Sequence, residues 1–405
     1  MTDLRNYALV TGAYWGFTLT DGALRMLVLL HFHALGYTPV QIAFLFLLYE
    51  FCGVVTNLVG GWIGSHFGLK ITLFAGLALQ VFALIMLALL DPDWSVAFSI
   101  AYVMAAQALS GVAKDLTKMS SKSAIKVVLP EGAETALFKW VAILTGSKNA
   151  LKGAGFFLGG LLLAWLGFRG SLLAMAAGLG LVLTVSVISL PKELGQAKVK
   201  VKFSSILSKS RNINLLSAAR LFLFGSRDIW FVVGLPVFLS ASLGWSHPQV
   251  GGFLALWVIG YGLVQSLAPR LLRRGLAGGT PRGGTASLGA FVLALLTGLI
   301  ALGVQLDLSP WLTVVSGLAL FGLIFALNSS VHSYLILAYS DSDRVALDVG
   351  FYYMANAAGR LVGTLFSGLV FQMAGLIGCL WVSAAFVLTA AIISLRLPRG
   401  RRAVV

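Results

Sequence analysis

Long apolar segments separated by short polar breaks make up most of this 405-residue sequence. Each segment is long enough to cross a ~30 Å hydrocarbon core as an α-helix, and none alternates apolar and polar residues as a barrel strand does. Because only helices and closed barrels satisfy their backbone groups in lipid, we expect an all-α integral membrane protein. Twelve transmembrane helices are predicted, over residues 8–34, 42–66, 70–90, 95–117, 138–165, 170–190, 213–240, 249–271, 286–306, 311–338, 346–373 and 375–395.

Composition agrees with a membrane protein and argues against two other classes. Hydrophobic residues make up 59% of the chain and charged residues only 11%, too few to keep the surface of one soluble domain in water. The net charge of +15 would suit a nucleic-acid-binding protein, but the basic residues form short tracts between apolar segments. We therefore expect the partner to be the lipid bilayer and not a nucleic acid.

Basic residues mark every second connection, which predicts the topology. The opposite connections contain Asp91, Asp93 and Asp307, with Arg169 as their one clear basic residue. Since cytoplasmic loops are enriched in Lys and Arg, both termini are predicted to be cytoplasmic. The tracts consist of Lys70; Lys118, Lys122 and Lys126; Lys192, Lys198, Lys200, Lys202, Lys209 and Arg211; Arg270, Arg273, Arg274 and Arg282; and Arg396, Arg399, Arg401 and Arg402.

The chain divides near its midpoint into two similar halves. A lysine-rich polar stretch, 191–212, predicts a cytoplasmic linker between six-helix bundles at 1–190 and 213–405, the second ending in a basic cytoplasmic tail. Such an internal duplication predicts two pseudo-symmetric bundles that meet at a central site. A shift of 208 positions places Gly36 on Gly244, Gln41 on Gln249, Lys152 on Arg360, Gly155 on Gly363, Gly160 on Gly368, Gly167 on Gly375 and Gly170 on Gly378.

Basic residues inside the predicted spans are the candidate substrate contacts. A charge within a span is costly and usually faces a cavity or a partner. Lys148 and Lys152 lie one helical turn apart and repel each other unless an anion or a neighbouring acid lies close to them. A small anionic substrate or acids of adjacent helices would both supply that charge. We favour the substrate, with contacts from Arg25, Lys148, Lys152, Arg220, Arg227 and Arg360.

Four acidic residues are the candidates for orienting or coupling roles. Asp21 precedes Arg25 by four residues, a spacing that allows a self-neutralised intrahelical pair as well as a binding role. Asp21 and Asp228 are expected to orient the arginines beside them. Asp21, Glu50 and Asp115 are candidate proton carriers for transport coupled to protons.

Neutral polar residues within the spans are candidates to orient a ligand, although hydrogen bonding between helices explains each of them equally well. The sequence has no GxxxxGK[ST] motif and no catalytic constellation, so we expect a gradient-driven protein that is not an enzyme, with no cofactor and no metal site. The cavity candidates are Tyr14, Asn57, Gln265 and Asn356.

Several long, charge-bearing stretches resemble one particular transporter family. They are WGFTLTDGALRMLVLLHFHALGYTPVQIA, NLVGGWIG, AQALSGVAKDLTKMSSKSAIK, KWVAILTGSKNALKGAGFFLGG and SAARLFLFGSRDIWFVVGLPVFL. In these stretches the sequence is similar to the organoarsenical efflux permeases of the major facilitator superfamily. Gly61, Gly68 and Lys70 also have the spacing of the signature loop of that superfamily, although Ser65 and His66 replace its acid and base.

The resemblance implies a monomeric, gradient-driven carrier in the bacterial inner membrane that works by alternating access. Its substrate would be 1-arseno-3-phosphoglycerate, made when glyceraldehyde-3-phosphate dehydrogenase accepts arsenate instead of phosphate, which makes that enzyme the functional partner. Export of this compound would confer arsenate resistance. The alternatives are an organophosphate/phosphate exchanger, a broader organic-anion exporter, or a membrane receptor or scaffold that transports nothing.

Overall fold

The computed structural model describes residues 2–67, 69–128, 134–190, 207, 210–275, 281–339 and 345–398, and every element within them is a helix. The predicted linker at 191–212 and the tail beyond residue 398 therefore lie almost entirely outside the described residues. The helices are α1 (Thr2–Ala34), α2 (Pro39–Phe67), α3 (Leu69–Ala88), α4 (Val96–Val128), α5 (Glu134–Ser189), α6 (Arg211–Phe231), α7 (Gly234–Ala241), α8 (His247–Gly275), α9 (Gly283–Gln305), the π-helical η2 (Trp311–Ser316), α10 (Gly317–Tyr339) and α11 (Val345–Ser394).

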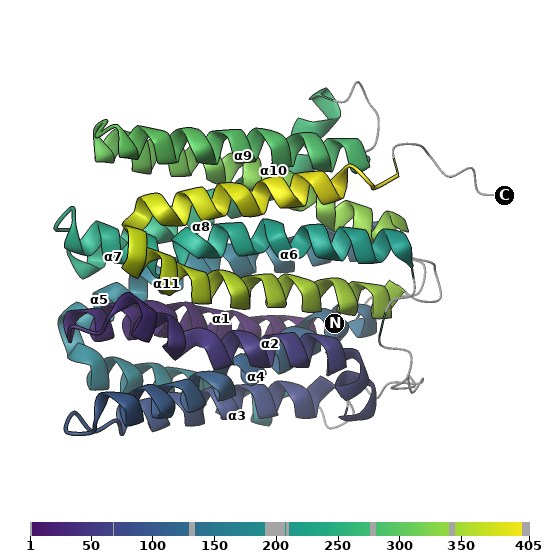
Figure 1. The fold of residues 1–405 in the computed structure, drawn as a ribbon. Helices are drawn as coiled ribbons and strands as arrows, with labels where there is room; N and C mark the ends of the chain where they lie inside the picture. The colour runs from purple at the N-terminus through teal and green to yellow at the C-terminus, as the bar shows by residue number, and fades with distance from the viewer. Residues whose placement is uncertain are drawn as a thin grey trace. The chain divides into compact units, whose positions relative to one another are not determined.

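Two of these helices are too long to be single crossings. α5 has 56 residues and α11 has 50, whereas about 20 residues cross a bilayer. Each contains one glycine with a non-helical backbone, Gly167 (φ 67°) and Gly375 (φ 60°). Figure 1 shows that α11 turns back on itself and forms two segments that run in opposite directions. The predicted pairs of spans on either side of Gly167 and Gly375 are therefore separate crossings.

The described residues account for the expected number of crossings. Nine of their helical stretches are long and apolar enough to cross a membrane, and two of these, Ser147–Ser189 and Asp348–Ser394, contain the glycine breaks and provide two crossings each. That makes eleven, and α1, which is not among the nine, has 33 residues and is long enough to be the twelfth. The prediction of a twelve-helix membrane fold agrees with this arrangement.

The backbone repeats the internal duplication seen in the sequence. Within the described residues, the glycines with positive φ are Gly36, Gly167, Gly244 and Gly375. They form two pairs, 36 with 244 and 167 with 375, each separated by the same 208 positions that relate the two halves. A left-handed backbone conformation favours glycine, so both halves use the same residue to turn the chain at the same place.

The starts of α2 and α8 show the same duplication in their hydrogen bonds. Gln41 accepts a hydrogen bond from the backbone N–H of Thr38 at 2.8 Å, and Gln249 accepts one from the backbone N–H of Ser246 at 2.8 Å. Both contacts satisfy a backbone donor just before a helix. The two halves therefore share their helix-start chemistry as well as their turns.

The chain divides into two compact units. Unit 1 comprises Met1–Tyr37, Phe44–Phe203 and Leu243–Ile259; unit 2 comprises Thr38–Ala43, Ser204–Ser242 and Gly260–Val405. These units follow the predicted halves, except that each includes a short segment from the other half of the sequence. The bundle boundaries at 1–190 and 213–405 stay a prediction.

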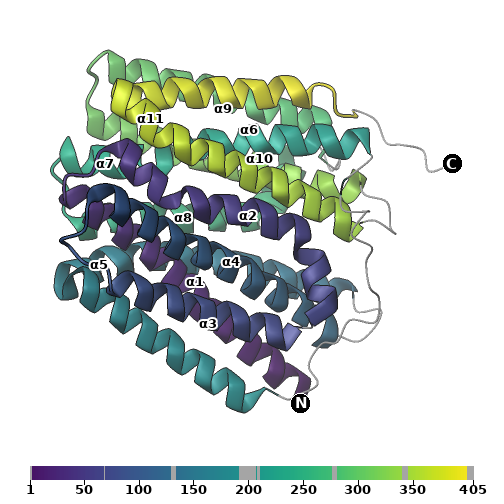
Figure 2. The ribbon, with the colours of Figure 1, turned by 60° about the horizontal axis from the view of Figure 1, so that its bottom comes forward.

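In unit 1, α1 packs against α5 through glycines. A Cβ atom at Gly155 would lie 2.5 Å from the carbonyl oxygen of Leu19, and one at Gly159 would lie 2.3 Å from that of Ala23. Small residues let the two backbones approach closely, as is common between membrane helices. Figure 2 shows α3 beside α4 in the same unit, and α3 also packs on α5.

In unit 2, α6 makes the corresponding close contact with the first segment of α11, which lies beside it in Figure 1. A Cβ atom at Gly359 would lie 2.1 Å from the carbonyl oxygen of Leu221, and one at Gly363 would lie 2.6 Å from that of Gly225. α9 packs on α11, where the Ser287 hydroxyl donates to the carbonyl oxygen of Ala391 at 3.0 Å. The close contact holds α6 and α11 in a fixed register.

Replacing Gly167 by alanine is expected to destabilise the folded protein by about 1–3 kcal/mol, because its φ of 67° with ψ of −176° is a backbone conformation that costs a residue with a Cβ about that much. Thermal unfolding of the purified protein in detergent measures this loss. Gly178→Ala is the matched control, since Gly178 lies in the helical part of the same α5 and an added Cβ meets nothing within 4 Å. Equal unfolding temperatures for the two variants would contradict the role of Gly167 as a turn.

Candidate functional site

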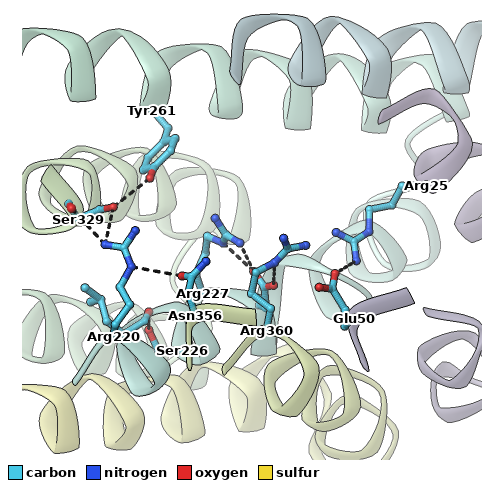
Figure 3. A network of polar contacts seen from close by, with 11 residues as sticks. Arg25, Glu50, Arg220, Ser226, Arg227, Tyr261, Ser329, Asn356 and Arg360 are labelled. Atoms are coloured by element: carbon cyan, nitrogen blue, oxygen red, sulfur yellow. Dashed lines mark hydrogen bonds and ion pairs between the residues drawn. The ribbon is translucent and has the colours of Figure 1, made fainter. Parts of the chain in front are cut away.

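One buried carboxylate binds two arginines where α6 meets α11 (Figure 3). The Arg227 Nε donates to Asp228 Oδ1 at 2.7 Å, and its Nη2 donates to the same oxygen. Arg360 Nε donates to Asp228 Oδ2 at 3.2 Å. The Asp228 side chain is 1% exposed, while Arg227 and Arg360 are 15% and 16% exposed. Two guanidinium groups thus share one carboxylate.

Arg220, two helical turns before Arg227 on α6, has a different environment. Its Nη1 donates to the backbone carbonyl and to the hydroxyl of Ser329 at 3.1 Å each, and its Nε donates to Asn356 Oδ1 at 3.3 Å. The Phe224 ring lies 3.8 Å from its guanidinium carbon and the Tyr352 ring 5.1 Å. Among the described residues, its hydrogen-bond acceptors are all neutral.

Hydroxyl and amide groups complete the surroundings of Arg220. Tyr261 and Gln265 on α8 donate to the Ser329 hydroxyl at 3.3 Å each, as Figure 3 shows for Tyr261. The structure thus brings together Arg220, Gln265 and Asn356, three residues that the sequence singles out as separate candidates. Ser329 and Tyr261 were not among the sequence candidates, because serine and tyrosine in a span do not stand out from neutral packing residues.

In unit 1, the acid that pairs with Arg25 differs from the expected one. Arg25 Nη2 donates to Glu50 Oε1 of α2 at 2.6 Å, whereas Asp21 accepts the hydroxyl hydrogen of Tyr49 at 2.7 Å. The intrahelical Asp21–Arg25 pair is therefore replaced by two contacts between α1 and α2. Figure 3 shows the Arg25–Glu50 pair. Arg25 pairs with Glu50 and not with Asp21 because Glu50 is fully buried, and an unpaired carboxylate there would be costly.

Tyr49 also links Asp21 to α4. The Lys114 ammonium nitrogen lies 4.0 Å from the centre of the Tyr49 ring, a cation–π distance. Arg25 contacts the same ring from 5.4 Å. Asp21, Tyr49, Glu50, Arg25 and Lys114 thus form one cluster built by α1, α2 and α4.

A second polar cluster joins α2 and α4. Lys118 donates to Asp115 Oδ1 at 2.7 Å and to Asn57 Oδ1 at 2.6 Å. Thr56 donates to Asp115 Oδ2 at 2.6 Å. Lys118 belongs to a basic tract that the sequence places in a cytoplasmic connection, but its side chain is only 17% exposed. Asp115 and Asn57 therefore have a structural ion-pair network around them, in addition to any role in coupling.

The remaining candidates are placed as follows. Lys148 and Lys152 lie half-buried on α5, and the Lys152 ammonium nitrogen is 5.8 Å from the centre of the Phe156 ring. Tyr14 is buried on α1, where its carbonyl oxygen accepts from the Thr18 hydroxyl at 2.8 Å. These three residues remain candidates for contact with the substrate because of their positions within the spans.

The comparisons with known proteins agree with this architecture. Two crystal structures of a POT family transporter share the fold: one in complex with a thioalcohol-conjugated peptide (TM-score 0.72, 15% identity) and one in complex with 5-aminolevulinic acid (TM-score 0.73, 14% identity). In both, the alignment covers 96% of this chain and 95% of the other. At such low identity the likeness establishes the fold alone. No curated protein matches the sequence.

The family is established by sequence. Residues 10–330, well over half of the chain, match the Major Facilitator Superfamily. The helical membrane-length segments, their glycine-divided pairs and the likeness to solved transporters all agree with that match. This multi-pass membrane transporter therefore belongs to the major facilitator superfamily.

Proposed function

We propose that this transporter exports a small organic anion with two charged ends, namely the organoarsenical 1-arseno-3-phosphoglycerate, from the bacterial cytoplasm. The observation that carries the proposal is the excess of positive charge in the buried contacts of unit 2. There Arg227 and Arg360 share one carboxylate, that of Asp228, and the acceptors of Arg220 among the described residues are neutral. Guanidinium groups do not lose their proton, so an anionic substrate would balance this charge.

The geometry at Asp228 suits recognition of an oxyanion. Asp228 uses both carboxylate oxygens to hold Arg227 and Arg360, which fixes the orientation of two guanidinium groups that each have five N–H donors. Fixed guanidinium forks bind phosphate or arsenate oxygens with two parallel hydrogen bonds. Asp228 is thus an orienting residue, and the arginines are the substrate contacts.

Unit 1 also has an excess of positive charge. Arg25, Lys114 and Lys118 are balanced by the three acids Asp21, Glu50 and Asp115. Lys148 and Lys152 on α5 add two further ammonium groups. With Lys114 and Lys118 counted beside the candidate residues, basic side chains outnumber acidic ones in unit 1, as they do in the Asp228 contact of unit 2, which favours a substrate with an anionic group at each end.

The identity of the substrate rests on the resemblance to organoarsenical efflux permeases. 1-Arseno-3-phosphoglycerate has an arsenate at one end and a phosphate at the other, so its charges match the two basic groups of residues. Glyceraldehyde-3-phosphate dehydrogenase would supply it in the cytoplasm. An organophosphate/phosphate exchanger or a broader organic-anion exporter is the second candidate, because the same charges would bind other organophosphates.

The proposed carrier is a monomer in the inner membrane with both termini in the cytoplasm, and it works by alternating access of two six-helix bundles. Connections rich in Lys and Arg alternate along the sequence with connections that have few basic residues, which supports this orientation. A gradient would drive the cycle, with Asp21, Glu50 and Asp115 as the proton carriers of a proton-coupled version.

Everted membrane vesicles test the proposed substrate. The vesicles are supplied on the outside with the dehydrogenase, glyceraldehyde-3-phosphate, the nicotinamide cofactor and arsenate, and arsenic inside them is measured. We expect uptake that requires both the dehydrogenase and this protein. Uptake of arsenate without the dehydrogenase, or no uptake, contradicts the organoarsenical assignment. Uptake of 3-phosphoglycerate at an equal rate without arsenate would favour the organophosphate exchanger.

A further inference from the structure

Arg220 is a buried cation whose described hydrogen-bond partners are all neutral. Arg220 is only 4% exposed, and it donates hydrogen bonds to Ser329 and Asn356. A guanidinium stays protonated even when buried, so neutralisation by proton loss is not available to it. Burying an unpaired charge costs several kcal/mol in a protein interior. Such a cost is expected where the charge has a function that requires it.

His332 on α10 is a second unusual group beside Arg220. It is 0% exposed, and neither ring nitrogen has a hydrogen-bond partner among the described residues. It follows Ser329 by three residues, which places both side chains on the same face of α10, and it lies within electrostatic range of Arg220. Buried polar groups are nearly always hydrogen-bonded, so an unpartnered imidazole at this place points to a ligand that is absent here.

The neutral donors around Arg220 are held by weak hydrogen bonds. Tyr261 and Gln265 both donate to the Ser329 hydroxyl at 3.3 Å, longer than the usual 2.7–3.0 Å or so. An ionised oxygen is a better acceptor than a hydroxyl, and hydrogen bonds to it are shorter and about twice as strong. An anion placed here would therefore gain donors that are already directed to one point.

The donors also come from different helices. Arg220 is on α6, Tyr261 and Gln265 are on α8, Ser329 and His332 are on α10, and Asn356 is on α11. Donors from four helices approach a ligand from several directions, which suits a tetrahedral group with oxygens at its corners better than a planar carboxylate.

We infer that Arg220, Ser329 and His332 form a subsite for one tetrahedral oxyanion, the phosphate or the arsenate end of the substrate. The inference rests on the proposed function, which supplies the identity of the substrate. It adds a site for substrate specificity that is separate from the contact of Asp228 with Arg227 and Arg360. Because Arg220 is 4% exposed, the subsite is closed in this structure. Entry of the anion replaces the two long hydrogen bonds to Ser329 and supplies a partner for His332.

A purely structural role makes the opposite prediction for His332. If the imidazole only fills space, leucine at this position removes two unsatisfied nitrogens and stabilises the fold, without any effect on anions. If it binds the oxyanion, leucine removes a donor and weakens anion binding, whatever it does to stability. The two roles are therefore separated by binding and not by stability alone.

The test uses the full-length protein reconstituted in lipid nanodiscs, with inorganic phosphate and 3-phosphoglycerate as probes of binding. Thermal unfolding is followed as each probe is titrated, since a ligand that binds only the folded state raises the unfolding temperature. We expect His332→Leu to weaken binding of both probes by about tenfold, the equivalent of one lost hydrogen bond to a charged group. His332→Gln, which retains a donor, should bind within about threefold of the wild type.

Two further variants complete the test. Ser329→Ala should weaken binding of both anions, as His332→Leu does. It keeps the inference testable if the more direct variant, Arg220→Gln, fails to fold. His33→Gln is the matched control, because His33 lies in the last turn of α1 in unit 1 and is not part of the subsite. Unchanged binding in His332→Leu and Ser329→Ala, or a wild type that binds neither probe, overturns the subsite.

The vesicle assay keeps this result distinct from the proposed function. Probe binding that depends on His332 without any dehydrogenase-dependent arsenic uptake would retain the oxyanion subsite and reject the organoarsenical. Arsenic uptake that is equal in the wild type and His332→Leu would retain the exporter and reject the subsite.

Discussion

Asp228→Asn is expected to lower the free energy of unfolding by about 3 kcal/mol or more and to abolish transport. Asp228 is 1% exposed and is the shared acceptor of Arg227 and Arg360. Asparagine has the same shape but no charge, so two largely buried guanidinium groups lose their counter-charge, a loss that costs about 3–5 kcal/mol for a buried ion pair. Chemical or thermal unfolding in detergent measures the stability, and vesicle uptake measures the transport.

The matched control for this variant is Asp93→Asn. Asp93 lies exposed in the turn before α4, and the same change of side chain there should shift stability by less than about 0.5 kcal/mol. An Asp228→Asn protein with wild-type stability would show that Arg227 and Arg360 have other counter-charges. A stable variant that also transports normally would remove Asp228 from the account.

Gly359→Ala is expected to have the second large effect, a loss of about 3 kcal/mol or more in folding and a fall in transport. A Cβ at this position would lie 2.1 Å from the backbone carbonyl oxygen of Leu221, a fixed atom that no side-chain rotation can move. α6 and α11 would have to separate by roughly 1 Å, beyond the overpacking that usually costs about 1–3 kcal/mol. Unfolding in detergent and vesicle uptake measure the two effects.

The same separation would move Arg227 on α6 away from Arg360 on α11, so transport should fall even in protein that still folds. Gly12→Ala is the control, since an added Cβ there meets nothing within 4 Å and alanine favours a helix. Equal stability of Gly359→Ala and Gly12→Ala would contradict the close contact between α6 and α11.

Much of the fold follows from local features of the sequence. Apolar length predicts each crossing, because every span must cover the same hydrocarbon thickness. The repeated glycines also carry real information: Gly36 with Gly244 and Gly167 with Gly375 are matched in sequence and have the same backbone turn. The exact helix ends could not be predicted, since two of these turns join spans without any polar loop.

The candidate site was predictable in its charges but not in its pairings. Arg25 illustrates the difference. Its spacing from Asp21 favours a pair within one helix, yet the fold places Glu50 of α2 at 2.6 Å from it. Which acid pairs with a given base depends on how neighbouring helices are rotated about their axes, and the sequence of one helix does not determine that rotation.

Neutral partners were the hardest part to predict. Ser329 accepts a hydrogen bond from Arg220, and His332 lies within electrostatic range of it. More than 100 residues separate each of the two from Arg220 in the sequence. A lone histidine or serine in an apolar span has no local signature, because either one is compatible with simple packing. Only the assembled helices show that both lie beside a buried guanidinium.

The most direct test of the account is dehydrogenase-dependent arsenic uptake by everted vesicles that contain the double variant Lys152→Gln, Arg360→Gln. These residues occupy equivalent positions in the two halves, so the variant removes one candidate contact from each. Arg169→Gln, an exposed basic residue beside the turn at Gly167, is the matched control. The account predicts uptake near the wild-type rate in Arg169→Gln and at least about a hundredfold loss in the double variant; uptake at the wild-type rate in the double variant would contradict the claim that these basic residues bind the transported anion.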